Sequence, residues 1–381
     1  MSDRDEARAT RSTLDVGTSY DFFVSLYVLH LPKKFGLRGA WASGMLARLS
    51  AESRDVLSRA QNVLPSPVHL LPGLPEPKNV ETLLWHLAQL PPTDRIRRLA
   101  CPWNLQQCGC PSLLEEVAAR GSWTEADRRQ LRESLQRGNG AEKPSDGEKV
   151  EGMLDLWADA TTFGEAYLSA LRNYYDVFFR EEERRIRPAI EAAAERVSDR
   201  SRRLPLPDLI EEISSGLRFD DLSEVDELVL APSFWLTPFT LRTRLDERRM
   251  LFVFGARSAN DSIVPGETVP DGLIRALKAL SDPTRLRILR LVADRSMGAA
   301  ELARALRLRT PTMLHHLHAL RLAGLIQIRV PEADTKKKAL FSMRPNVAQD
   351  VLASLVDFLR EKDDEDHRAD DAKRASEGGS P

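Results

Sequence analysis

A short segment rich in hydrogen-bonding side chains carries the clearest chemistry in this sequence. Its guanidinium, hydroxyl and imidazole groups come from Arg309, Thr310, Thr312, His315 and His316. Side chains of these types form hydrogen bonds with base edges and with phosphate oxygens of duplex DNA. We therefore predict that these five residues contact DNA, and we ask which elements would hold them against a groove.

The first element that could hold the segment is a helix beginning at Asp282 and Pro283. The aspartate carboxylate can cap free N–H groups, and a proline at the first helical position loses no hydrogen bond. Apolar residues follow at helical spacing. They are Leu286, Ile288, Leu289 and Val292.

Two further helices complete a predicted helix-turn-helix. A short one follows Gly298, with Glu301 placed as in a capping box, and a longer one begins at Pro311 and ends at Gly324. The longer helix has inward positions at spacings of four and three, which are Met313, Leu317 and Leu320. In such a motif the start of the second helix reads bases in the major groove.

A predicted hairpin follows the three helices. Residues 325–330 and 339–343 are typical of two strands, and the polar stretch 331–338 between them is typical of a turn. Lys336, Lys337 and Lys338 would lie at its tip, where a wing can touch phosphate or the minor groove. We add them, together with Arg321, to the predicted DNA-binding residues.

The segment resembles the ArsR family of bacterial transcriptional regulators. The resemblance is carried by LSDPTRLRIL at 280–289, ELARAL at 301–306 and PTMLHHLHALRLAGLI at 311–326. It implies a winged-helix repressor or activator that is dimeric and whose DNA affinity responds to a signal. This chain has Leu314 where the family usually has a serine, so an apolar contact with a thymine methyl could replace a polar one. Leu322 replaces a residue that is usually charged.

Many members of that family sense metals through cysteines on the first helix of the helix-turn-helix or through ligands on the last helix. This chain has no cysteine after Cys110, and residues 347–362 contain no histidine. His315 and His318 share a helix face, but a metal there would need further ligands from elsewhere. We predict no cofactor.

The predicted last helix, residues 347–362, carries an apolar stripe. The stripe consists of Val347, Val351, Leu355 and Leu359, widened by Leu352 and Phe358. A small winged helix has little core in which to bury such a stripe. We therefore expect this helix to pair with a second copy in a homodimer, or to pack on the N-terminal region.

Charge is unevenly distributed along the 381 residues, although the formal net charge is only −2. Residues 270–362 hold 17 Lys/Arg against 9 Asp/Glu, a net charge of +8, whereas residues 363–381 hold 3 against 7. A basic segment of this kind suits a partner with phosphates, and double-stranded DNA is the partner we predict.

The composition indicates a cytoplasmic protein without a membrane partner. Three cysteines in a chain of this length disfavour a secreted protein built on disulfides. The N-terminal residues lack the apolar core of a signal peptide, and the most apolar run, residues 22–31, is too short to span a bilayer.

The predicted fold is mainly α: a large helical N-terminal region with a small β hairpin or sheet, then a C-terminal winged helix-turn-helix. Residues 1–13 and the acidic tail 363–381 are expected to be disordered. Residues 14–256 would form the sensor and dimerisation region, with a possible internal linker at 137–150 and strands near 228–231 and 250–254. Residues 257–269 would connect this region to the DNA-binding domain, residues 270–362. Some long ArsR-family members show a loosely similar N-terminal pattern.

One cysteine cluster is the chemical feature of the N-terminal region. Cys101, Cys108 and Cys110 form C-x6-C-x-C, and His86 is a possible fourth ligand. The spacing fits no common zinc framework, so a metal site, a redox disulfide and plain structural cysteines all stay open.

We interpret the protein as a DNA-binding transcriptional regulator that binds operator DNA as a dimer and receives a signal in its N-terminal region. A small-molecule effector is one candidate for that signal. The alternatives are a DNA-tethered protein-interaction module and a thiol or metal sensor that uses the three cysteines. No G-x-S-x-G, H-E-x-x-H, Walker or dinucleotide motif occurs, so we do not expect an enzyme. The acidic run 181–183 is typical of a solvated face, and the aromatic residues are more typical of a core than of a ligand pocket.

Overall fold

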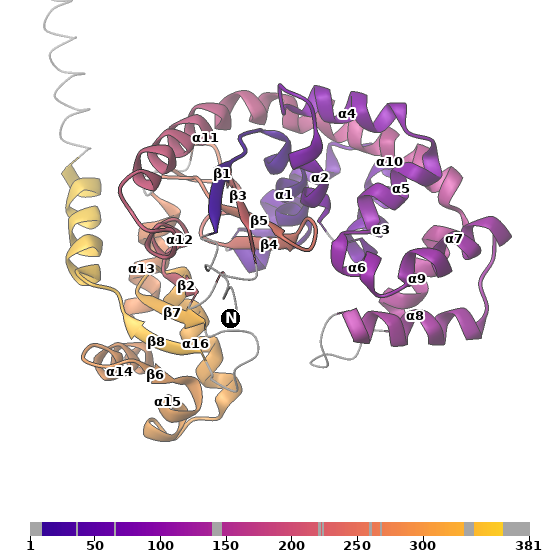
Figure 1. The fold of residues 1–381 in the computed structure, drawn as a ribbon. Coiled ribbons are helices and arrows are strands. Elements are labelled where there is room, and N and C mark those ends of the chain that lie inside the picture. The colour runs from indigo at the N-terminus through magenta and orange to yellow at the C-terminus, as the bar shows by residue number, and fades with distance from the viewer. Residues whose placement is uncertain are drawn as a thin grey trace, which may run out of the picture. The chain divides into compact units, whose positions relative to one another are not determined.

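A computed structural model describes residues 10–35, 37–64, 66–138, 147–219, 222, 225–258, 261–266, 269–330 and 339–360. It divides into two compact units (Figure 1). The N-terminal unit comprises Met1–Arg202 and Leu222–Ala256, and the winged-helix unit comprises Arg203–Asp221 and Arg257–Pro381. The predicted wing tip, the acidic tail and most of the predicted linker lie outside the described residues.

The N-terminal unit is largely helical, as predicted. Side-chain caps and prolines set many of its helix boundaries: Ser50 Oγ accepts from Ser53 N, and Asn79 Oδ1 from Thr82 N. Its helical elements are α1 (Ser19–His30), η1 (Pro32–Phe35), α2 (Gly39–Ala47), α3 (Ala51–Val63), η2 (Pro67–Gly73), α4 (Val80–Gln89), α5 (Pro92–Ala100), α6 (Trp103–Gln107), α7 (Cys110–Arg120), α8 (Glu125–Gly138), α9 (Gly147–Ala158), α10 (Ala160–Tyr174), η3 (Tyr175–Phe179) and α11 (Arg180–Ser201).

A four-stranded sheet accompanies these helices in the order β1-β3-β5-β4. The strands β1 (Arg11–Leu14), β3 (Glu227–Ser233) and β5 (Arg249–Gly255) run parallel, and β4 (Thr240–Arg244) pairs antiparallel with β5. The predicted small sheet is therefore present, although its two predicted strands are parallel neighbours and not a hairpin. Residues 11–13, expected to be disordered, instead pair with β3 as an edge strand.

Two of the three carboxylates in the acidic run at the start of α11 lie in the core, which corrects the expectation of a solvated face for them, while Glu181 is exposed as expected. Glu182 and Glu183 are each only 4% exposed. Trp235 Nε1 donates to Glu182 at 2.9 Å, and the Tyr175 hydroxyl donates to Glu183 at 3.2 Å. Trp235 comes from a distant segment of the chain, which explains why the local charge pattern missed the burial.

Many aromatic residues of the N-terminal unit pack against one another in its core. Phe22 lies at the centre, with ring centroids 5.3 Å from Phe179 and 5.4 Å from Tyr174. The indole of Trp235 stacks on Trp41 at 6.2 Å. Buried members of this aromatic set include Phe22, Phe23, Phe163, Tyr167, Tyr174, Tyr175, Phe178, Phe179 and Trp235. Core packing, and not a ligand pocket, thus accounts for them.

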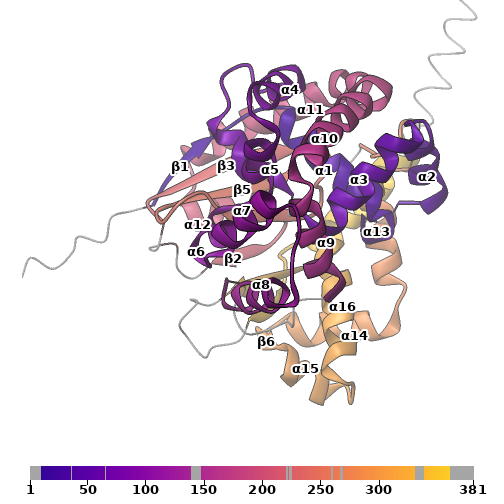
Figure 2. The same ribbon diagram turned by 90° about the vertical axis from the view of Figure 1, so that its right-hand side faces the viewer.

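The winged-helix unit contains the predicted helices (Figure 2), together with the predicted hairpin and an added strand (Figure 1). Its elements are α12 (Leu206–Ile213), β2 (Leu217–Phe219), α13 (Asp271–Leu280), α14 (Pro283–Val292), β6 (Met297–Gly298), α15 (Ala299–Ala305), α16 (Thr310–Leu322), β7 (Ile326–Val330), β8 (Leu340–Met343) and a helix over residues 347–360. The sheet order is β2-β7-β8-β6, with β7 and β8 antiparallel as the predicted hairpin requires.

The strand β2 joins the winged-helix sheet from a segment that the sequence analysis assigned to the N-terminal region. It pairs parallel with β7, aligning Leu217 with Ile328. Gly216 permits this approach, because its φ is +104° and an added Cβ would lie 3.0 Å from the Ile326 carbonyl oxygen. The Gly216 carbonyl also accepts from Ile328 N at 2.6 Å. Residues 203–221 therefore group with the DNA-binding part of the chain.

One continuous apolar core holds α13 to α16 and the hairpin together. Its buried members include all three predicted inward positions of α16 together with Ile288, Leu289, Val292, Leu302 and Phe341. Leu286 departs from the predicted stripe, because it is 48% exposed. Burial of the other residues fixes the rotation of α16 and so determines which of its side chains face outward.

Candidate nucleic-acid interface

The recognition helix α16 is fixed at both ends by local backbone geometry. It starts after Arg309, with Pro311 in its first turn, where a missing N–H costs no helical hydrogen bond. It ends at Leu322, two residues before Gly324, whose φ of +70° lets Leu325 N donate to the Leu320 carbonyl at 3.0 Å. Met313, Leu317 and Leu320 fill the core on one side.

The opposite side of α16 exposes four of the predicted DNA-binding residues together. They are Arg309, Thr310, Thr312 and His315, and all lie at the helix start or in its first two turns. Residues 302–330 contain no aspartate or glutamate, so no carboxylate within this stretch neutralises its arginines. Exposed donors beside arginines that have no carboxylate nearby in the sequence suit phosphates and base edges.

His316 is placed apart from this outward group. Its side chain is only 15% exposed, and its Nδ1 lies 3.8 Å from Asp282 Oδ2. Asp282 caps α14 by accepting from Thr284 N at 2.7 Å and Arg285 N at 3.1 Å. The hydrogen bond from Arg285 N is the largest influence that lowers the pKa of Asp282, with a smaller contribution from His316. The structure thus places His316 between two helices, where it can orient α16 on α14.

The remaining predicted DNA contacts lie elsewhere. Arg321 is in the last turn of α16, about 18 Å along the axis from Arg309 at 1.5 Å per residue. It is half-buried, and this burial lowers the pKa of its guanidinium. Lys336, Lys337 and Lys338 lie outside the described residues.

Sequence reasoning missed two exposed arginines beside the recognition helix, Arg304 and Arg307. Arg307 lies in the turn between α15 and α16 with a φ of +55°, a conformation that favours glycine or asparagine over arginine. Its side chain is exposed, as is that of Arg304. An exposed arginine kept at such a position is a candidate for a phosphate contact. A non-glycine residue in the left-handed region is not visible in the sequence pattern.

Comparison with known proteins agrees with this geometry. Residues 282–327 match the model of the bacterial regulatory protein, arsR family. The transcriptional repressor SdpR of Bacillus subtilis (strain 168) is 31% identical over 90 residues, which cover 93% of SdpR and 23% of this chain. The chain belongs to the ArsR family of transcriptional regulators.

Two further relatives are similar to this ArsR-family chain. An uncharacterised HTH-type transcriptional regulator of Methanocaldococcus jannaschii is 43% identical over 53 residues, which cover 60% of that protein and 14% of this chain. A solved ArsR-like transcriptional regulator from Rhodococcus sp. RHA1 is 23% identical, with a TM-score of 0.20, over 29% of this chain and 94% of its own.

The last helix of this ArsR-family regulator divides its apolar residues between two faces. Val347 and Val351 are buried in the core of the unit. Leu352, Val356 and Leu359 are exposed by 61%, 41% and 62%. The predicted stripe is therefore divided: Leu352 and Leu359 join Val356 in an exposed stripe with spacings of four and three. Leu355 and Phe358 are partly buried.

The cysteine cluster does not come together as a metal site. Cys108 and Cys110 are joined in a disulfide, and Cys101 is a free, buried thiol. Burial is the largest influence that raises the pKa of the Cys101 thiol, to about 12. Among the described residues, no three His, Cys, Asp or Glu side chains are grouped as metal ligands require. His86 and the three cysteines therefore share no site there.

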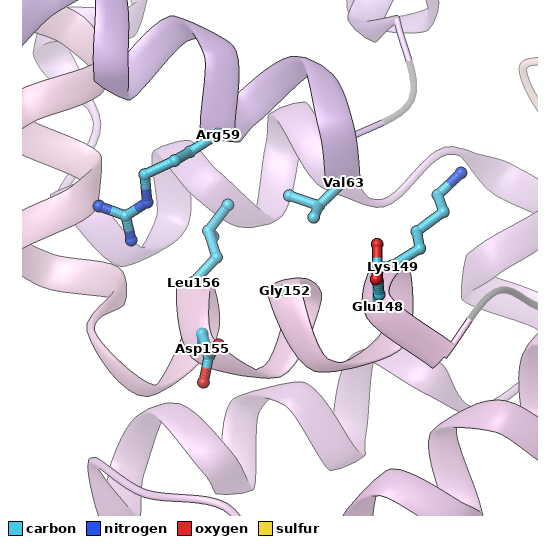
Figure 3. A pocket seen from close by; sticks show the side chains of 7 residues that line it. All are labelled: Arg59, Val63, Glu148, Lys149, Gly152, Asp155 and Leu156. Atoms are coloured by element: carbon cyan, nitrogen blue, oxygen red, sulfur yellow. The ribbon is translucent and has the colours of Figure 1, made fainter.

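Two open cavities lie among the described residues of the N-terminal unit. One, of 450 Å³, lies between α3 and α9, where Leu156 points toward Arg59 and Val63 (Figure 3). The other, of 630 Å³, is lined by residues of η2, α5, α6, α7 and the β4–β5 turn, including Arg97, Arg98 and Arg249. None of the buried aromatic residues lines either cavity. Helices of the described ranges are all too short or too polar to cross a membrane.

Proposed function

We propose that this ArsR-family regulator binds operator DNA as a homodimer through the outward face of α16, and that its N-terminal unit receives the signal that changes DNA affinity. The observation that carries the DNA-binding part is the joint exposure of Arg309, Thr310, Thr312 and His315 within a stretch free of carboxylates. Such a face can bind phosphates strongly and still present donors to base edges.

The dimer rests on the exposed stripe of the last helix. Leu352, Val356 and Leu359 lie at spacings of four and three on one helical face. A second copy of the same helix would cover this face by the same contacts, as a two-fold axis requires. The operator is then a near-palindrome with half-sites one helical turn, or a multiple of one, apart. Sedimentation of the wild type and of Leu352→Glu tests this, because the charge should shift a dimer toward monomer.

Signal reception is assigned to the N-terminal unit because the winged-helix unit lacks the family's usual metal ligands and because the 630 Å³ cavity lies in the N-terminal unit. Three of the lining residues are arginines, and two of them have ion-pair partners: Arg97 with Asp94 and Glu115, and Arg249 with Glu227 and Asp246. Arg98 is exposed and makes no ion pair within the described residues. We therefore propose that a small effector with an acidic group binds in this cavity. The protein would bind the effector without converting it and would use no cofactor.

The experiment for signal reception uses full-length protein and a fluorescent duplex selected from a random pool. DNA affinity is measured by anisotropy while a panel of small carboxylates and phosphorylated metabolites is added. Arg98→Ala should keep the basal affinity and lose the response, whereas Arg54→Ala, an exposed arginine on α3 outside both cavities, should keep both. If Arg98→Ala still responds to the effector, the proposal that the effector binds in this cavity is wrong.

A further inference from the structure

The recognition helix exposes one large apolar side chain among its polar ones. Leu314 is 48% exposed. It lies one turn after Thr310 and one turn before His318, so it shares their side of α16. Nothing in the unit's core requires it, because Met313, Leu317 and Leu320 already fill the inward face. An exposed leucine on the helix face that would contact DNA is stabilised if an apolar group of the DNA covers it.

The major groove offers one such partner. Of the four bases, only thymine presents a methyl group there, at C5, and the other groove edges present hydrogen-bond donors and acceptors. A leucine side chain can neither donate nor accept a hydrogen bond, so it cannot bond to those donors and acceptors. It contributes to binding affinity only by covering the methyl group. Thr310 and His315, which flank it, can bond to the neighbouring bases or phosphates.

We propose that Leu314 contacts the C5 methyl group of a thymine and so specifies thymine at one position of each operator half-site. The inference rests on the proposed function, since it requires α16 to enter the major groove. Burying one methyl group corresponds to about a three- to four-fold gain in affinity per half-site. The exposed stripe on the last helix is a separate surface and leaves Leu314 available to DNA.

The test replaces thymine by uracil, which keeps every hydrogen-bonding group in the groove and lacks only the methyl. Full-length wild-type protein first selects a duplex from a random pool, and each dT of the selected half-site is then replaced singly by dU. We expect one position at which dU weakens wild-type binding about three- to four-fold. At that position Leu314→Ala should bind the dT and dU duplexes equally.

Leu286→Ala is the matched control, because Leu286 is also 48% exposed but lies on α14. It should keep the wild-type preference for dT over dU. Unchanged thermal unfolding of both variants would verify that each is folded, as expected for exposed helix positions replaced by alanine. A selected duplex with no dU penalty, or a penalty that persists in Leu314→Ala, would overturn the role of Leu314 and leave the proposed function standing. Failure of the wild type to prefer any duplex would overturn the proposed function itself.

Discussion

The two units of the chain treat charged side chains in opposite ways. In the N-terminal unit Asp21, Lys78, Arg95, Glu182 and Glu183 are buried and held by hydrogen bonds or ion pairs. In the described part of the winged-helix unit, by contrast, one charged residue, Arg257, is fully buried. The buried charges of the first unit serve its own structure, whereas arginines such as Arg307 and Arg309 of the second are exposed, where an external partner can contact them.

The contrast is sharpest between a buried carboxylate and an exposed guanidinium. Asp21 accepts from Ser233 Oγ at 2.7 Å, Trp235 N at 2.8 Å and Phe234 N at 3.1 Å. Arg309 has no ion-pair partner in the part of the chain that the structure describes. Removal of the Asp21 carboxylate should therefore lower the stability of the fold, and removal of the Arg309 guanidinium should weaken DNA recognition. The predictions below test this division.

The largest effect is expected for Asp21→Ala. The substitution leaves three buried donors without an acceptor, which should lower the free energy of unfolding by about 3–5 kcal/mol. Asp55→Ala, at an exposed position of α3, is the control and should change stability by less than about 0.5 kcal/mol. Chemical denaturation of the full-length variants measures both. Similar stabilities for the two would show that the buried network is not structural.

The pH dependence of stability gives a second test of the same carboxylate. Burial is the largest influence on Asp21 and raises its pKa to about 7, against its hydrogen bonds, which lower it. The folded state then holds a proton more tightly than the unfolded state, so stability from this group falls as pH rises from about 4 to about 7. The effect is on the order of a few kcal/mol. Chemical denaturation at several pH values in this range should show the loss of stability in wild type and not in Asp21→Asn. An equal change of unfolding free energy with pH in the two proteins would contradict this assignment to Asp21.

Gly216→Ala tests the unexpected edge strand of the winged-helix unit. The new Cβ would lie 3.0 Å from the Ile326 carbonyl and from Gln327 Cα, at a φ that an alanine rarely adopts. We expect a loss of about 1–3 kcal/mol in the unfolding of this unit. Gly266→Ala is the control, because its φ is also positive but nothing lies within 4 Å of an added Cβ. Equal losses would mean that the approach to β7 contributes nothing.

The smallest effect on stability is expected for Arg307→Gly, and it should be favourable. Glycine adopts the left-handed turn conformation of this position without the side-chain clash, so stability should rise by about 1 kcal/mol or less. DNA affinity should fall at the same time for all sequences alike, with a shallower salt dependence, because one phosphate contact is lost. Calorimetry and anisotropy measure the two. A variant that gains stability with unchanged DNA affinity would remove Arg307 from the interface.

Local sequence signals were sufficient where an element is specified by its own residues. The cap of α14 follows from Asp282 and Pro283, and the inward face of α16 follows from three apolar residues at helical spacing. The hairpin of β7 and β8 likewise follows from two alternating stretches joined by a polar turn. These features depend on residues that are close together in the sequence. They were sufficient to predict the position of most residues of the candidate interface.

Features that depend on distant partners could not be predicted. The strand β2 is recognisable only beside β7, which lies more than a hundred residues later in the chain. Burial of Glu182 depends on Trp235, and the inward position of His316 depends on Asp282. For the glutamate and the histidine, the residue type alone is typical of an exposed site, and the tertiary partner reverses the expectation.

The central claim, that the outward face of α16 reads DNA, is tested most directly by a specificity ratio. The affinity of full-length protein for its selected operator is divided by that for a scrambled duplex of equal length, at one salt concentration. Arg309→Ala should lower this ratio by about ten-fold or more. Arg290→Ala, an exposed arginine on α14, should leave it unchanged. A ratio unaffected by Arg309→Ala, or lowered equally by both variants, would contradict the account.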